Sequence, residues 1–394
     1  MKEIFNNVFY IGAEDKELDL FENQYKLKNG VTYNSYAIID SKTIVLDSVD
    51  SRKNKTWIDN IKLVLNKRNL DYFVISHLEP DHSGSIEDLL KEYPETTIVG
   101  TEKMFSMLPQ FINEQSIKKS NKLIVKDNDT LLLGNHNFIF YSAPMIHWPE
   151  VLTCYESTTK IFFSADAFGT FGIPHKLIAN TLEEATGWPD EGRRYFTNIV
   201  GKYGIAVQNL IKKLSNLNIS TIAPLHGPIL TGEINHYINL YNIWSSYSSE
   251  KNGTLIVYST MHGNTKNIAL YAQKYLETLN EPTEIFDISR SDVSSVLSKA
   301  FIYNKLLLVT VTYDGDNMPC MQDFLFHLKI KNLKNKKIGI IQNGSWGPVA
   351  GKITFDYLNN LKELKIIEFI PTVKSKMKES DKTEINKLIT DLIK

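Results

Sequence analysis

A short segment, residues 76–84, contains two histidines and two carboxylates, all of them between His77 and His82. It directly follows an apolar run, residues 72–75, which is typical of a buried strand. Side chains at a strand end are held by a rigid sheet and can still point into a cavity, which suits a metal site. A strand with such an end restricts this part of the chain to folds in which a sheet edge carries a polar site.

The spacing within the segment favours a common direction for its polar side chains. His77, Glu79 and Asp81 are two residues apart, so a locally extended chain would place all three on one side. Pro80 cannot extend a strand ladder, and we expect it to keep the segment a loop before a helix over residues 85–93. Many polar loops with two histidines bind no metal, so a metal site requires further ligands elsewhere in the chain.

Three later strands supply such candidates. His147, Asp166 and His226 each lie at or just past the end of a predicted strand, over residues 137–142, 160–164 and 220–223. A single histidine after a strand is usually a packing or hydrogen-bonding residue. The repeated placement at strand ends nevertheless indicates one shared site.

The first half of the chain reads as short strands with few helices. Further strands are predicted over residues 7–11, 35–40, 43–47 and 97–100, with a hairpin turn at 41–42. Residues 122–125, 130–133 and 137–142 read as a β-meander, and helices are predicted over residues 53–68 and 195–214.

The pattern changes after a polar, serine-rich stretch over residues 245–253, which reads as a linker. Strands predicted over residues 254–258, 283–288, 306–311, 337–342 and 366–370 then alternate with helices over 265–279, 321–328, 349–364 and 381–393. Such alternation describes a doubly wound parallel sheet. We therefore expect an α/β protein with two domains, residues 1–249 and residues 253–394.

Three loops of the second domain have the composition of a flavin site. The first lies between the first strand and the first helix, where hydroxyls and backbone N–H groups meet the positive end of a helix dipole. The other two follow later strands, where Tyr313 and Trp346 offer aromatic faces. The loops resemble the FMN-binding loops of flavodoxins, and their residues are Ser259, Thr260, Met261, His262, Gly263, Asn264 and Thr265; Thr312, Tyr313, Asp314 and Gly315; and Asn343, Gly344, Ser345, Trp346 and Gly347.

Composition excludes several classes of partner. The formal net charge is −1, with 42% hydrophobic and 23% charged residues, so we expect neither a nucleic acid nor a membrane as partner. Two distant cysteines, Cys154 and Cys320, cannot build a disulfide framework or a thiolate-rich metal site. This cysteine usage and the lack of a signal-like start lead us to expect a cytoplasmic protein.

The candidate ligands of the first domain favour a redox metal. Three imidazoles and three carboxylates could hold two metal ions with one carboxylate bridging, and several carboxylates shift the preference toward iron or manganese. His82 could be a seventh ligand or could lie behind the ligands. The six candidates are His77, Glu79, Asp81, His147, Asp166 and His226.

The order of these segments resembles the metallo-β-lactamase fold. Hydrolases of that superfamily carry His-x-His-x-Asp-His, whereas this chain has Glu79 at the second of these positions. Together with the flavodoxin-like second half, this exchange is similar to the flavodiiron proteins, and the similarity covers nearly the whole chain. The resemblance therefore implies an αβ/βα sandwich of metallo-β-lactamase type followed by a flavodoxin-like sheet.

The resemblance also implies roles for individual residues. One iron would be held by His77, Glu79 and His147, the other by Asp81 and His226, with Asp166 bridging, and His82 would be held off the metals. Tyr195 resembles a tyrosine near the diiron pocket, whereas Phe196 stands where the family often has a second tyrosine. Trp148 reads as pocket wall.

By the same resemblance, the chain is expected to reduce O2 to water, NO to N2O, or both, with two irons and one FMN per chain. No Cys-x-x-Cys pair occurs in the chain, so we expect electrons from another protein of the rubredoxin type. A head-to-tail homodimer, or a tetramer built from it, is expected.

Two other hypotheses stay open at this point. The first is a metal-dependent hydrolase with a flavodoxin-like appendage, in which bound zinc and no flavin would be found. The second is an electron carrier without catalysis, in which His147 and His226 would be dispensable.

Overall fold

The structure is a computed structural model that describes residues 2–394. The chain forms two compact units: the first runs to Phe196 and resumes over Ile205–Asn242, and the second comprises Thr197–Gly204 and Ile243–Lys394. The expected domain limits, 1–249 and 253–394, stay a prediction. Among the described helices, none has both the length and the apolar character of a membrane span.

The first unit contains two seven-stranded sheets. In the first sheet the strands lie in the order β1 (Lys2–Phe5), β2 (Val8–Tyr10), β7 (Tyr36–Ile39), β8 (Thr43–Leu46), β9 (Tyr72–Val74), β10 (Thr97–Gly100) and β11 (Asn121–Ile124). In the second they lie in the order β12 (Thr130–Leu132), β13 (Asn137–Ser142), β14 (Leu152–Glu156), β15 (Ile161–Phe163), β17 (Thr221–Ala223), β18 (Ile229–Thr231) and β16 (Ile178–Ala179). Two small ribbons pair β3 (Ala13–Asp15) with β6 (Val31–Tyr33), and β4 (Leu20–Phe21) with β5 (Tyr25–Lys26).

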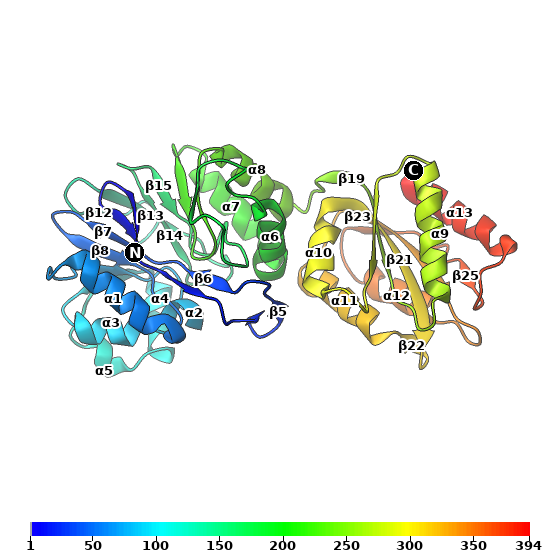
Figure 1. The fold of residues 1–394 in the computed structure, drawn as a ribbon, viewed down its shortest axis with the longest axis horizontal. Coiled ribbons are helices and arrows are strands. Elements are labelled where there is room, and N and C mark those ends of the chain that lie inside the picture. Colours follow the sequence, from blue (N-terminus) through cyan, green and yellow to red (C-terminus); the bar gives the residue numbers. More distant parts are fainter. Residues whose placement is uncertain (1) are drawn as a thin grey trace. The chain divides into compact units, whose positions relative to one another are not determined.

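One apolar core joins these sheets. It combines Val8, Ile38 and Val74 from the first sheet with Phe140 and Phe163 from the second, all of them buried. Helices cover the outer faces, and Figure 1 shows α1 and α3 beside the first sheet and α7 and α8 beside the second. The helices are α1 (Asn54–Leu65), α2 (Pro80–Ser83), α3 (Ile86–Glu92), α4 (Glu102–Met107), α5 (Glu114–Ile117), α6 (Trp188–Tyr195), α7 (Gly204–Leu214) and α8 (Ile234–Ser245).

The second unit is a doubly wound sheet. Its parallel strands lie in the order β20 (Thr283–Asp287), β19 (Lys251–Tyr258), β21 (Tyr303–Tyr313), β23 (Lys336–Asn343) and β24 (Leu364–Ile366), which is the flavodoxin-like order 2-1-3-4-5. Short strands β22 (Asp316–Asn317) and β25 (Thr372–Val373) pair with β21 and β23. The helices are α9 (Asn264–Thr278), α10 (Val293–Ile302), α11 (Pro319–Ile330), α12 (Ala350–Asn359) and α13 (Glu379–Ile393).

The two faces of this sheet are covered by different helices. Ile268 of α9 and Leu388 of α13 share one buried cluster with Ile256 and Leu307 of the sheet. In Figure 1, α10 and α11 lie on the opposite side of the strands from α9 and α13. The predicted α/β class and both architectures are therefore confirmed.

Several local expectations were wrong. Pro80 does not keep its segment a loop but occupies the first position of helix α2, where its missing N–H costs nothing. The predicted meander is divided, because β11 pairs in parallel with β10 in the first sheet while β12 begins the second. The helix predicted over residues 195–214 is interrupted by a π-helical segment, Phe196–Val200, and a 3-10 turn, Gly201–Tyr203, whose glycine disfavours an α-helix.

Candidate metal centre

The predicted ligands come from the ends of strands in both sheets of the first unit. His77 and Glu79 follow β9, and Asp81 lies in α2. From the second sheet, His147 follows β13 and Asp166 follows β15. His226 follows β17, so all six predicted ligands are delivered where the sheets end.

Four side chains form a first group of donor atoms. His147 Nε2 lies 3.0 Å from Glu79 Oε2 and 3.1 Å from Asp166 Oδ2. His77 Nε2 lies 3.3 Å from the same Glu79 oxygen and 3.4 Å from the same Asp166 oxygen. These four atoms lie close enough together to bind a single ion placed between them.

A second group lies on the other side of Asp166. His226 Nε2 lies 3.3 Å from Asp81 Oδ2 and 3.0 Å from His82 Nε2. The other oxygen of Asp166, Oδ1, is 3.3 Å from His82 Nε2 and 3.7 Å from His226 Nε2. Asp166 thus presents one oxygen to each group, as the bridging carboxylate of a two-metal site would.

These separations fit metal ligands. Donors about 2.1 Å from an ion lie roughly 3.0 Å apart in octahedral and roughly 3.4 Å apart in tetrahedral geometry. The Nδ1 atom of His226 donates a hydrogen bond to the Thr32 carbonyl oxygen at 2.7 Å, so the ring is oriented with Nε2 toward His82. The Nε2 atoms of His226 and His82 lie 3.0 Å apart, close enough to share a proton or to bind one ion together. Asp81 Oδ1 is also buried without a hydrogen-bond partner among residues 2–394, which leaves it available to an ion.

His82 lies among the candidate ligands. Its side chain is fully buried, and its Nε2 atom belongs to the second donor group. Because Pro80 begins a helical turn, Asp81 and His82 leave the extended path expected for this segment. The expectation that His82 stands off the metals stays a prediction, because donor atoms alone do not fix where an ion lies.

Burial and neighbouring carboxylates act in opposite directions on the histidines. Burial lowers the pKa of His147, but hydrogen bonds with Asp166 and Glu79 prevail and raise this pKa to about 9. Burial also opposes charge on His77, yet Asp166 and Glu150 raise its pKa well above the usual value. The site as a whole thus favours positive charge, which metal ions supply when they displace the protons.

Two residues behind the ligands were not predicted as part of the site. Glu150 Oε1 lies 2.8 Å from His77 Nδ1 and accepts the backbone N–H of Leu78 at 3.0 Å. Thr32 holds His226 in the corresponding way through its carbonyl oxygen. Such partners fix the ring orientation and make the ligand nitrogen more basic. The only sequence signal for Glu150 was its place three residues after His147.

Three aromatic residues were singled out in the sequence beside the predicted ligands. Tyr195 is fully buried, its ring is 5.7 Å from that of His226, and its hydroxyl has no hydrogen-bond partner among the described residues. Burial and then the charge of Asp166 raise its pKa, so the phenol stays protonated. Phe196 packs edge-on against Tyr241, and the edge-on contact of Trp148 with His77 fits the expected pocket wall.

The three predicted flavin loops line one cavity in the second unit. It measures about 600 Å³ and includes every predicted loop residue except Ser259 and Gly263. Trp346 is 88% exposed and Tyr313 42% exposed beside it, so both rings are open to a planar ligand. Ser375, which follows β25, also lines the cavity and was not predicted.

The phosphate end of this cavity is built by the first loop. Gly263 precedes α9 with φ of +94°, a left-handed conformation that glycine adopts without strain. The Ser259 hydroxyl of the same loop is buried and has no hydrogen-bond partner among the described residues, although Ser259 does not line the cavity itself. Thr312 has a different task, since its Oγ1 accepts the N–H groups of Val349 and Ala350 at the start of α12.

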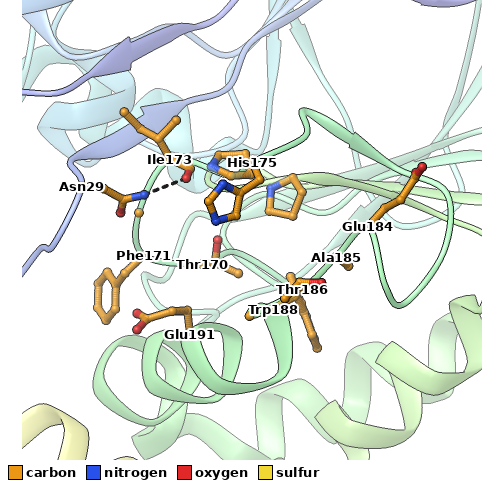
Figure 2. A pocket seen from close by; sticks show the side chains of 14 residues that line it. Asn29, Thr170, Phe171, Ile173, His175, Glu184, Ala185, Thr186, Trp188 and Glu191 are labelled. Atoms are coloured by element: carbon orange, nitrogen blue, oxygen red, sulfur yellow. Dashed lines mark hydrogen bonds between the residues drawn. The ribbon is translucent and has the colours of Figure 1, made fainter.

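A further pocket of the first unit, shown in Figure 2, is a poor candidate for access to the metals. It measures only about 160 Å³, and Asn29 donates a hydrogen bond across it to the Ile173 carbonyl. None of the predicted ligands lines it.

Comparisons with known proteins agree with this geometry. The profile of the "ODP family beta lactamase" matches residues 31–227. The fold is that of rubredoxin oxygen:oxidoreductase from Desulfovibrio gigas (TM-score 0.91, 21% identity, 100% of this chain and 97% of that one) and of the flavodiiron protein from Giardia intestinalis (TM-score 0.87, 24% identity, 100% and 95%). The anaerobic nitric oxide reductase flavorubredoxin of Aliivibrio fischeri is 30% identical over 349 residues, which make up 87% of this chain and 69% of the relative.

The chain belongs to the flavodiiron protein family. Flavodiiron proteins carry a diiron site and FMN, and the residues of this chain fit both: Asp166 faces two groups of donors, and residues of all three flavin loops line one cavity.

Proposed function

We propose that this flavodiiron protein is an oxidoreductase that reduces O2 to water, NO to N2O, or both, with electrons from an external donor such as rubredoxin. The observation that carries the proposal is the position of Asp166, whose two oxygens face two separate groups of N and O donors. The names of the relatives agree, since one is a nitric oxide reductase flavorubredoxin and one a rubredoxin oxygen:oxidoreductase.

The metal ligands proposed here are His77, Glu79, His147, Asp166, Asp81 and His226. When bound, the irons and the FMN supply the electrons of the reaction. The chain would fix the coordination: Asp166 would hold one ion with each oxygen, while Glu150 and Thr32 hold the imidazoles of His77 and His226.

The hydrolase alternative is disfavoured by the ligand set. Glu79 adds a hard anionic oxygen where the hydrolases of this superfamily carry a second imidazole, and several oxygen ligands favour iron over zinc. The electron-carrier alternative leaves the converging donor atoms of the first unit without a purpose. Metal analysis separates these possibilities, because a hydrolase would contain zinc and no flavin.

The decisive experiment is anaerobic turnover with reduced rubredoxin on purified protein of known iron and flavin content. We expect consumption of at least one of the two gases, and loss of this activity in His147→Ala. His136→Ala is the matched control, because His136 is a buried histidine that pairs with Asp40 rather than with the metal group. A preparation with two irons and one FMN per chain that consumed neither gas would refute the proposal.

We further propose the head-to-tail homodimer, in which the flavin of one protomer serves the metals of its partner. A monomer at assay concentration with full turnover would argue against it.

A further inference from the structure

The metal centre is most exposed at two of its carboxylates. The side chains of Glu79 and Asp81 are each 15% exposed and that of His147 is 9% exposed, whereas those of His77, His82, His226 and Asp166 are at most 1% exposed. A cavity of about 600 Å³ lies over these two carboxylates. A small substrate would therefore reach the metals through this cavity.

The cavity carries one buried phenol. Tyr33, at the end of β6, lines it, and its side chain is buried. Its ring meets that of His226 edge-on, with 6.0 Å between the ring centroids. This contact places Tyr33 beside the second donor group.

A hydrogen bond from Arg52 determines in which direction the Tyr33 hydroxyl can donate its hydrogen. Arg52 Nη2 donates a hydrogen bond to the phenol oxygen at 2.8 Å. Because that oxygen accepts from Arg52, the hydroxyl hydrogen is directed elsewhere, and the structure gives it no acceptor among residues 2–394. The phenol therefore offers a hydrogen to whatever occupies the cavity.

Two carboxylates favour this orientation of Arg52, whose side chain is 47% exposed. Its Nε and Nη2 atoms bind the two carboxylate oxygens of Asp50 at 2.9 and 3.0 Å, and Nη1 lies 3.4 Å from Asp15 Oδ2. A guanidinium held by two carboxylates keeps its geometry with little entropy left to lose. Arg52 is also the only cationic side chain among the residues that line this cavity.

We propose that Tyr33 donates a hydrogen bond to the small ligand bound at the metal centre, and that Arg52 holds it in the donating orientation. The ligand class is a diatomic or triatomic molecule with a lone pair on its outer atom, such as NO, reduced O2 or azide. The inference rests on the proposed function, since it assigns a partner for the substrate of that same site.

The test is infrared spectroscopy of NO bound to the reduced, iron-loaded protein, together with azide titration. In Tyr33→Phe we expect the N–O stretch to move to higher wavenumber and azide to bind about 2- to 10-fold more weakly, as for the loss of one hydrogen bond. Tyr10→Phe is the matched control, because the Tyr10 hydroxyl is buried without a partner and packs against Tyr36, outside the cavity.

Arg52→Gln is the second test variant. It should move the N–O stretch in the same direction as Tyr33→Phe but by a smaller amount, because the phenol remains and loses the hydrogen bond that orients it. If Tyr33→Phe lost its iron, this variant would decide, and an unchanged stretch in it would overturn the inference.

The outcomes separate the inference from the function. Unchanged frequency and azide affinity in Tyr33→Phe, with normal turnover of the unmodified protein, would overturn the role of Tyr33 alone. An iron-loaded unmodified protein that bound neither NO nor azide would overturn both.

Discussion

Glu150 offers a direct way to test whether His77 is a metal ligand. Its carboxylate oxygen lies 2.8 Å from His77 Nδ1, and the side chains of both residues are 0% exposed. Glu150→Gln keeps a hydrogen-bond acceptor of nearly the same size but removes the negative charge that makes Nε2 a stronger donor. If Nε2 binds iron, the metal should be held more weakly.

The expected loss of iron affinity follows from the position of Glu150 behind His77. Replacement of a hydrogen-bonded partner behind a metal ligand typically weakens metal binding about 10- to 100-fold, or roughly 1.4 to 2.8 kcal/mol. Glu150→Ala should in addition destabilise the metal-free protein, because the buried donors His77 Nδ1 and Leu78 N lose their acceptor, at about 1 to 3 kcal/mol each.

The assay is competition for Fe(II) between the protein and a chelator of known affinity, under anaerobic conditions. Glu156→Gln is the matched control, since Glu156 is also a buried carboxylate but accepts the N–H groups of Asn137 and Thr158 rather than a histidine. Equal iron affinity in Glu150→Gln and the unmodified protein, or an equal loss in Glu156→Gln, would refute the reasoning.

Three further predictions concern the flavin, the assembly and the second unit. Ser259→Ala should weaken FMN binding about tenfold in a fluorescence titration without destabilising the flavin-free protein, because the buried hydroxyl has no partner until a phosphate arrives; unchanged affinity would place the phosphate elsewhere. A mixture of His147→Ala and a flavin-loop variant, each inactive alone, should regain part of its turnover if the dimer is head to tail, and none otherwise. Burial lowers the pKa of Lys336 from 10.5 to about 7; between these values the unfolded chain binds more protons than the folded one, so stability should rise with pH in this window. Lys336→Met should abolish that rise in urea unfolding between pH 7 and 10, and a slope equal to that of the unmodified protein would contradict the assignment.

The strand-end positions of the ligands could be predicted because they depend on local patterns. An apolar run followed by a polar residue shows both where a strand ends and which side chain it delivers. By this reasoning His147, Asp166 and His226 were expected near one another, and in the structure both histidines lie beside Asp166. The regular alternation of strands and helices predicted the second unit for the same reason.

What failed depended on contacts between distant segments or on a choice between two local conformations. Glu150 meets His77 across 73 residues, and no spacing in the sequence records that pairing. Pro80 is compatible with a loop and with the first turn of a helix, and the helical choice brought the His82 side chain into the second donor group. Ser375 follows a two-residue strand that is too short to leave a periodic pattern.

Charge explains why a glutamate at position 79 suits this buried centre. The carboxylates of Glu79, Asp81 and Asp166 contribute three negative charges within the donor groups, and Glu150 adds a fourth behind His77. Two divalent ions bring four positive charges, so the occupied site would be close to neutral, whereas a histidine in place of Glu79 would leave one positive charge uncompensated. An uncompensated charge in a buried site is costly. The same balance accounts for the raised pKa of His77 and His147, since without metal the carboxylates draw protons onto the imidazoles. The six predicted ligands and Glu150 thus form a single electrostatic unit, in which the charges of Glu79 and Glu150 act directly on the histidines.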